Sequence, residues 1–188
     1  MKFNFLNRKL RILYITNGFV LLAGAMLAPI YALFVEDMGG DLLDAGLTST
    51  VFFLTAGIVT LLSGKYSDKI KENELIVVFG YVIMAIGFSL YLFASSIWML
   101  YIIQFVIGLG EAIYSPPFDA IYSKYLDKGK SGDQWGIWEA MSYFSIAAGA
   151  FAGGLVVTYF GFNSIFVIMS LLCLMSAIYI YRLPRKVL

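Results

Sequence analysis

Six long apolar runs, separated by gaps of alternating charge character, constrain this chain more than any other feature of its sequence. The runs cover roughly residues 12–35, 45–64, 75–94, 97–122, 136–160 and 163–181. Each run is long enough to cross a hydrocarbon core of about 30 Å as a helix. Lipid-exposed backbone must be hydrogen-bonded internally, and runs without strict alternation favour helices over barrel strands. The sequence therefore predicts an all-α, polytopic membrane protein with six transmembrane helices, in a single domain covering residues 1–188.

All 13 Lys and Arg residues fall on one side of this six-span threading. They precede the first run or follow the second, fourth and sixth runs: Lys2, Arg8, Lys9, Arg11, Lys65, Lys69, Lys71, Lys124, Lys128, Lys130, Arg182, Arg185 and Lys186. Cytoplasmic loops carry the Lys/Arg excess in membrane proteins. We therefore expect an integral plasma (inner) membrane protein with both termini cytoplasmic.

Composition argues against several other classes of protein. The chain is 61% hydrophobic and 13% charged, against about half and about a quarter in soluble domains. The net charge of +1 gives no electrostatic footprint for nucleic acid. With no His and a single cysteine, Cys173, the chain lacks the commonest metal ligand and any Ser or Cys nucleophile with a His base. We expect no metal, no cofactor and no enzymatic activity.

The fourth run carries a row of polar and small residues at helical spacing. Its members are Tyr101, Gln104, Gly108, Glu111, Ser115 and Asp119, which share one helical face. Glu111 falls near the bilayer midplane, where a carboxylate is costly and is a functional candidate by default. No basic residue lies inside any run, so we expect Glu111 to be protonated part of the time or to pair with a cationic substrate. The alternative is a neutral Glu111 that hydrogen-bonds to another helix and holds the bundle together.

Three further residues join Glu111 as candidates for binding a substrate or a proton: Gln104, Tyr101 and Ser115. Asn17, in the first run, is a fourth candidate, with a contact between helices as its alternative role. Asp119 and Glu139 fall near the inner ends of the fourth and fifth runs. They could form a gate of ion pairs with Lys65, Lys69 or Lys124, or could simply be solvated at the membrane interface.

Prolines occur at similar depths in the first and fourth runs. Pro29 lies near the outer end of the first run and Pro116-Pro117 near the inner end of the fourth. This placement predicts two inverted three-helix repeats, runs 1–3 and runs 4–6. Because proline has no N–H, Pro116 and Pro117 leave the carbonyls of Ala112 and Ile113 free. These carbonyls could serve a substrate or a hinge, or the prolines could mark a packing kink.

The connection between the second and third runs resembles a known motif. Gly64-Lys65-Tyr66-Ser67-Asp68-Lys69 is similar to the G-x-x-x-D-[RK] opening of the signature loop of major facilitator superfamily transporters, with Ile70-Lys71-Glu72-Asn73 in place of the later Gly and basic residues. Gly64, Asp68 and Lys69 are the gating candidates that this resemblance implies. The stretch from Gln104 to Gly110 is similar to the superfamily's fourth-helix motif, with Gln104 in place of the Arg that many members use in proton coupling.

The fifth run contains Gly149-Ala150-Phe151-Ala152-Gly153-Gly154. It resembles the G-P-x-x-G-G motif of antiporters, with Ala150 in place of Pro. Gly149, Gly153 and Gly154 are also small residues of the kind that let membrane helices approach closely.

The superfamily resemblance implies a fold and a function. Its members have twelve helices in two six-helix halves related by an axis along the membrane normal, and this chain corresponds to one half bundle, similar to the N-terminal one. The implied function is secondary active transport of a small polar or cationic solute by alternating access, as a parallel homodimer of half-size units in the lipid bilayer. Helices 1, 2, 4 and 5 would line the cavity and helices 3 and 6 would face lipid. A coupling proton is a further candidate partner.

The alternative is a non-transporting half: a scaffold or regulatory subunit, or the N-terminal part of a twelve-helix transporter.

Overall fold

The computed structural model describes residues 7–67 and 69–184, and these residues form helices and connecting turns without any strand. Six helical segments are long and apolar enough to cross a membrane. They are α1 (Arg8–Leu27) with η1 (Ala28–Ile30) and α2 (Tyr31–Asp37); α3 (Leu42–Ser67); α4 (Asn73–Leu90) with η2 (Tyr91–Phe93); α5 (Ile97–Lys124); α6 (Ser131–Phe160); and α7 (Phe162–Arg182). The all-α prediction with six spanning helices is confirmed.

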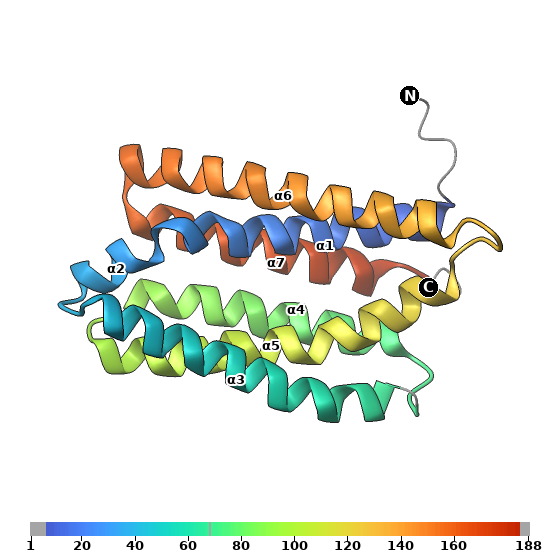
Figure 1. Ribbon diagram of the computed structural model, residues 1–188, viewed down its shortest axis with the longest axis horizontal. Coiled ribbons are helices and arrows are strands. Elements are labelled where there is room, and N and C mark those ends of the chain that lie inside the picture. Colours follow the sequence, from blue (N-terminus) through green and yellow to red (C-terminus); the bar gives the residue numbers. More distant parts are fainter. Residues whose placement is uncertain (1–6, 68, 185–188) are drawn as a thin grey trace.

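The two ends of the bundle differ in charge. The start of α1, the end of α7 and the α3–α4 and α5–α6 connections lie at one end (Figure 1), together with every basic residue that the structure describes. We call this the basic end, and the opposite one the far end. Short turns join the helices at the far end, where only the segment around Gly39 and Gly40 has room for a loop. Lys2, Arg185 and Lys186, which the charge pattern included, lie outside the described residues.

The helices pack as two groups of three that are interleaved in sequence. In one group α1 contacts α6 and α7, and in the other α5 contacts α3 and α4, while α4 against α7 joins the groups (Figure 1). Exchanging α1 with α5, α3 with α6, and α4 with α7 maps the contacts of one group onto those of the other and leaves the α4–α7 contact unchanged. This is the contact pattern of two inverted three-helix repeats, one formed by the first three spans and one by the last three.

The sequences of α1 and α5 match at the offset that this symmetry requires. Leu13-Tyr14-Ile15 in α1 corresponds to Leu100-Tyr101-Ile102 in α5. The same offset of 87 residues pairs Asn17 with Gln104 and Pro29 with Pro116. The first helices of the two repeats are therefore alike in residue type as well as in packing.

Glycines allow the closest approaches within each group. A Cβ atom built on Gly149 of α6 would lie 2.5 Å from the carbonyl oxygen of Leu22 in α1, and one on Gly153 would overlap the Met26 carbonyl. In the other group, a Cβ atom on Gly108 of α5 would lie 2.7 Å from the carbonyl oxygen of Phe52 in α3. Gly154, next to Gly153, faces open space. Gly149 and Gly153 thus pack α6 on α1, whereas Gly154 contributes nothing to this contact.

The prolines have different effects in the two matched helices. At Pro29 the first span is broken into α1, the 3₁₀ turn η1 and α2, because proline cannot donate a backbone hydrogen bond and clashes with the preceding turn. α5 continues through Pro116 and Pro117. The Ile113 carbonyl, which has no N–H donor at Pro117, accepts a hydrogen bond of 3.2 Å from the hydroxyl of Ser63 in α3. One of the two carbonyls predicted to be free is therefore used for packing between helices.

Candidate functional site

Glu111 lies in the middle of α5 and is partly buried. The hydroxyl of Tyr114, one turn further along the same helix, lies 2.9 Å from Oε1 and 3.0 Å from Oε2 of Glu111. One phenolic proton therefore faces both carboxylate oxygens. Residues three apart on a helix are neighbours, so the geometry of α5 alone brings this pair together.

Two further side chains connect Tyr114 to the other helix group. The rings of Tyr114 and Tyr81, in α4, meet edge to face with their centroids 4.8 Å apart. The hydroxyl of Tyr81 donates a 2.9 Å hydrogen bond to Oδ1 of Asn17 in α1. We call Asn17, Tyr81, Glu111 and Tyr114 the middle cluster. It joins three helices at mid-depth, and Asn17 is buried in it as a bridge between α1 and α4.

Small residues make room for the middle cluster. A Cβ atom on Gly80 of α4 would lie 2.6 Å from the Cβ atom of Tyr114. The backbone of α4 therefore approaches α5 closely enough for Tyr81 and Tyr114 to share one edge-to-face contact. Cys173 of α7 is fully buried. The carboxyl group of Glu111 is thus near a tyrosine-lined interior and not on a lipid-facing surface.

Gln104 belongs to a second cluster, nearer the far end. Its Nε2 donates a 3.1 Å hydrogen bond to the hydroxyl of Tyr91 in η2. The hydroxyl of Tyr31, in α2, donates to Thr48 Oγ1 of α3 at 2.8 Å, and Tyr31 also interacts with Gln104 and Tyr91. We call Gln104, Tyr91, Tyr31 and Thr48 the far cluster. It ties α5 to the broken end of the first span and to α3.

The rest of the polar row on α5 does not face one common space. Tyr101 is partly buried, with its ring 5.7 Å from that of Trp98. Ser115 is partly exposed, and Asp119 is exposed towards the basic end. Glu139, on α6, is exposed as well. Of the residues predicted to bind substrate, the structure places Asn17 and Glu111 in the middle cluster. Gln104 lies in the far cluster.

A third cluster, which was not predicted from the sequence, lies at the basic end. The hydroxyls of Tyr14 in α1 and Tyr122 in α5 are 2.8 Å apart, and the backbone carbonyl of Gln134 in α6 lies 3.0 Å and 2.6 Å from them. The side chain of Gln134 forms two hydrogen bonds with Asp127, one to its backbone N–H and one to its carboxylate, at 2.8 and 2.9 Å. We call Tyr14, Tyr122, Gln134 and Asp127 the basic-end cluster. Trp138 stacks on Tyr14.

Comparison with known proteins shows the family of this chain. The family model of the Major Facilitator Superfamily matches residues 13–187. The chain belongs to this superfamily. The match covers all six spanning helices apart from the first residues of α1, and members of the superfamily are transporters rather than enzymes.

Several members of the superfamily are similar to this chain. The multidrug resistance protein MdtG of Serratia proteamaculans is 23% identical over 171 residues, which cover 89% of this chain and 41% of that protein. An uncharacterised MFS-type transporter of Methanocaldococcus jannaschii is 27% identical over 168 residues, covering 88% and 42%. The multi-drug resistance efflux pump PmrA of Streptococcus pneumoniae is 26% identical over 170 residues, covering 89% and 42%. This MFS chain spans less than half the length of the relatives it matches.

The signature loop of this MFS chain lies at the basic end. Gly64, in the last turn of α3, has open space where a side chain would stand, and Lys69 is exposed. Asp68 lies outside the described residues. No neighbour among the described residues therefore explains the glycine at position 64.

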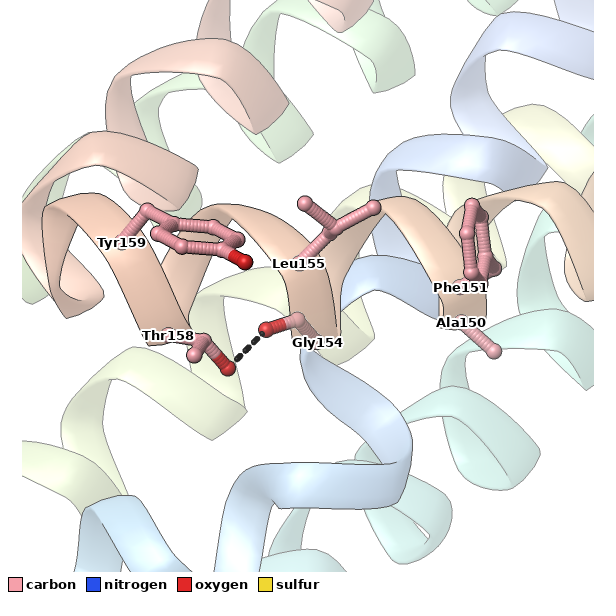
Figure 2. A pocket seen from close by; sticks show the side chains of 6 residues that line it. All are labelled: Ala150, Phe151, Gly154, Leu155, Thr158 and Tyr159. Carbon is pink, nitrogen blue, oxygen red and sulfur yellow. Dashed lines mark hydrogen bonds between the residues drawn. The ribbon is translucent and has the colours of Figure 1, made fainter.

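A shallow groove runs along the far half of α6 (Figure 2). Its lining comes from one helix: Ala150, Phe151, Gly154, Leu155, Thr158 and Tyr159. The hydroxyl of Thr158 donates a 2.7 Å hydrogen bond to the backbone carbonyl of Gly154 (Figure 2), so this hydroxyl is satisfied within the helix. Among the described residues, no three His, Cys, Asp or Glu side chains are grouped closely enough to hold a metal ion.

Proposed function

We propose that this MFS chain is half of a secondary active transporter, which moves a small polar or cationic solute across the membrane by alternating access. The observation that carries this proposal is the position of Glu111. It lies at the middle of a 28-residue spanning helix, while every basic residue of the sequence lies near an end of a run. The carboxyl group therefore has no permanent cation at its depth, and a proton or a cationic solute supplies the compensating charge.

The surroundings of Glu111 favour a cation with apolar parts. Tyr81 and Tyr114 place aromatic rings beside the carboxyl group, and ring faces attract cations. Two of the similar proteins are described as a multidrug resistance protein and an efflux pump. These descriptions support export of drug-like compounds by this chain, and the Glu111 carboxyl group favours cationic ones, with Glu111 binding the solute or the coupling proton.

We infer that two copies form the transporter as a parallel homodimer. α3 and α6 are the least covered of the six spanning helices. Gly57 and Gly64 on α3 and Gly154 on α6 face open space, as they would if a second bundle packed against them. Because the two halves of an MFS transporter share the same orientation, a second copy related by an axis along the membrane normal can occupy that position. In this dimer α1, α3, α5 and α6 line the cavity.

The orientation follows from the charge at the two ends. The basic end is proposed to be cytoplasmic, because cytoplasmic loops carry the Lys/Arg excess, in a plasma (inner) membrane. The signature-loop residues Gly64, Asp68 and Lys69, together with Asp119 and Glu139, would then form the cytoplasmic gate between the two copies.

A second candidate function rests on the length of the chain. It covers 41–42% of the three relatives described above, so it could instead be a non-transporting half that needs a separate six-helix partner. This alternative predicts that the purified chain moves no solute in liposomes, whereas the homodimer predicts uptake that is lost in Glu111→Gln.

Crosslinking tests the dimer and its orientation directly. Leu47 lies five residues after the start of α3, and Leu155 five residues before the end of α6, so the two lie at the same depth. Both are exposed in the single chain. In a Cys173→Ala background, we expect a Leu47→Cys/Leu155→Cys variant to form crosslinked dimers in liposomes.

The matched control pairs Leu47→Cys with Gly136→Cys, near the other end of α6. Its two thiols lie at opposite depths, so a parallel dimer leaves them unlinked and an antiparallel dimer links them. A monomer in both variants would favour the non-transporting half.

A further inference from the structure

Two lysines at the basic end approach the ring of one tyrosine. Nζ of Lys9, in the first turn of α1, lies 3.9 Å from the ring centroid of Tyr125, and Nζ of Lys124 lies 5.4 Å from it. Both distances are within the range of a cation–π contact. Two cations are therefore gathered at one ring, where their charges repel each other.

The backbone around this ring is fixed by a hydrogen bond between helices. Nδ2 of Asn7 donates to the backbone carbonyl of Tyr125 at 2.9 Å. Oδ1 of the same side chain accepts from the backbone N–H of Leu10 at 2.9 Å and so caps α1. Asn7 thus holds the start of α1 against the end of α5, and with it the relative positions of Lys9 and Tyr125.

Asp127, the first acidic residue after Tyr125, already has a hydrogen-bond partner. The carboxylate of Asp127 accepts a hydrogen bond from Nε2 of Gln134, as part of the basic-end cluster. Other basic residues are close in sequence: Arg8 and Arg11 beside Lys9, and Lys128 and Lys130 after Lys124. The junction of α1 and α5 is thus a basic site with an aromatic floor at the end of the spanning helices.

We propose that this junction binds the phosphate of an anionic phospholipid headgroup, between Lys9 and Lys124 and beside the ring of Tyr125. A phosphate placed between the two ammonium groups relieves their repulsion and accepts charge-assisted hydrogen bonds from both. The junction lies where α1 starts and α5 ends, at the depth of the headgroups, and basic pockets between spanning helices bind anionic headgroups. The acyl chains would lie along the bundle surface between these helices.

Native mass spectrometry of the purified protein tests this site with two lipids, phosphatidylglycerol and phosphatidylcholine. We expect phosphatidylglycerol to be retained preferentially. The Lys9→Gln/Lys124→Gln variant should lose about 25-fold in affinity for it, since each lysine near an anionic headgroup contributes roughly fivefold. Tyr125→Phe should retain the lipid as the wild type does, because it keeps the ring, and Tyr125→Leu should bind it more weakly.

The charge-matched control is Lys71→Gln/Arg182→Gln, which removes two cations from the same end of the bundle. Equal losses in the control and the Lys9/Lys124 variant would overturn the site, since only net charge would then matter. Equal retention of both lipids by the wild type would overturn it as well. If inorganic phosphate displaces phosphatidylglycerol, the site recognises phosphate but belongs to a soluble phosphate compound, and the assignment to a lipid headgroup is overturned.

Discussion

The hydroxyl of Tyr114 faces both carboxylate oxygens of Glu111, at 2.9 and 3.0 Å. Because both residues belong to α5, this pair persists in any arrangement of the helices that leaves α5 intact. What can change is the other side of Tyr114, whose ring contacts Tyr81 of α4. Tyr81 in turn donates a hydrogen bond to Asn17 of α1, in the other helix group. A movement between the two groups would therefore shift or break this outer hydrogen bond and leave the Tyr114–Glu111 pair in place.

The first prediction concerns this pair. Glu111→Gln should abolish transport, or make it independent of pH, while the protein still folds. Tyr114→Phe should weaken transport by about 10- to 100-fold, because a hydrogen bond to a charged group contributes about 1.5–3 kcal/mol. Uptake into proteoliposomes at several pH values measures both effects. Tyr179→Phe, an exposed tyrosine of α7, a helix that does not line the proposed cavity, is the control and should transport normally. Unchanged, pH-dependent uptake in Glu111→Gln would remove Glu111 from the mechanism.

A second prediction compares two adjacent glycines of α6. Gly153→Val should lower the free energy of unfolding by about 1–3 kcal/mol or more, because the new side chain would overlap the Met26 carbonyl of α1. Gly154→Val should leave the stability of the single chain within about 0.5 kcal/mol, because its Cβ atom meets no neighbour. Thermal unfolding in detergent distinguishes them. Equal destabilisation by both changes would contradict the close contact between α1 and α6.

A third prediction tests why Ser63 binds a backbone carbonyl. Ser63→Ala should cost about 0.6 kcal/mol, the average for a hydrogen bond between membrane helices. In a Pro117→Ala background the new N–H at position 117 can donate to the Ile113 carbonyl, so the same serine change should cost less. A double-mutant cycle of unfolding free energies measures this coupling. Additive effects of the two changes would mean that Ser63 does not compensate for the proline.

The fourth prediction concerns the basic-end cluster. Tyr122→Phe removes the hydroxyl that lies 2.8 Å from Tyr14 and 2.6 Å from the Gln134 carbonyl. It should destabilise the protein by about 1–3 kcal/mol, because two buried hydrogen bonds of about 0.5–1.5 kcal/mol each are lost, while Tyr14 keeps its own hydrogen bond to the Gln134 carbonyl. Backbone amides of residues 126–134 should exchange hydrogen faster. Tyr179→Phe, on the exposed face of α7, should change neither quantity. Unaltered exchange in Tyr122→Phe would show that the cluster does not hold the α5–α6 connection.

The spanning helices could be predicted from the sequence because length and apolarity alone determine them in a bilayer. The repeat was also predictable, since Pro29 and Pro116 lie at corresponding positions of α1 and α5. The helix start at Ser131 was not, since polar residues there read as a loop and the fifth span was expected from residue 136. Gln134 was therefore missed, although it lies in the first turn of α6.

The candidate site was predictable only along single helices. The depth of Glu111 follows from counting residues in α5, and Tyr114, three residues later, could have been named on the same ground. Tyr81 could not, because its contact with Tyr114 depends on how closely Gly80 lets α4 approach α5. Likewise, the partner of Asn17 lies 64 residues away in sequence, and no spacing rule identifies it.

The interleaving of the two helix groups determines the order in which the bundle can be completed. α1 packs chiefly against α6 and α7, which the ribosome makes only after α3, α4 and α5. While the chain is being inserted, the face of α1 around Leu22 and Met26 therefore borders lipid or the insertion machinery instead of α6. Asn17 lacks its hydrogen-bond donor until α4 arrives. α1 thus enters the bilayer before α3, α4 and α5 but reaches its native neighbours only after them, and an error in α6 would leave it unburied.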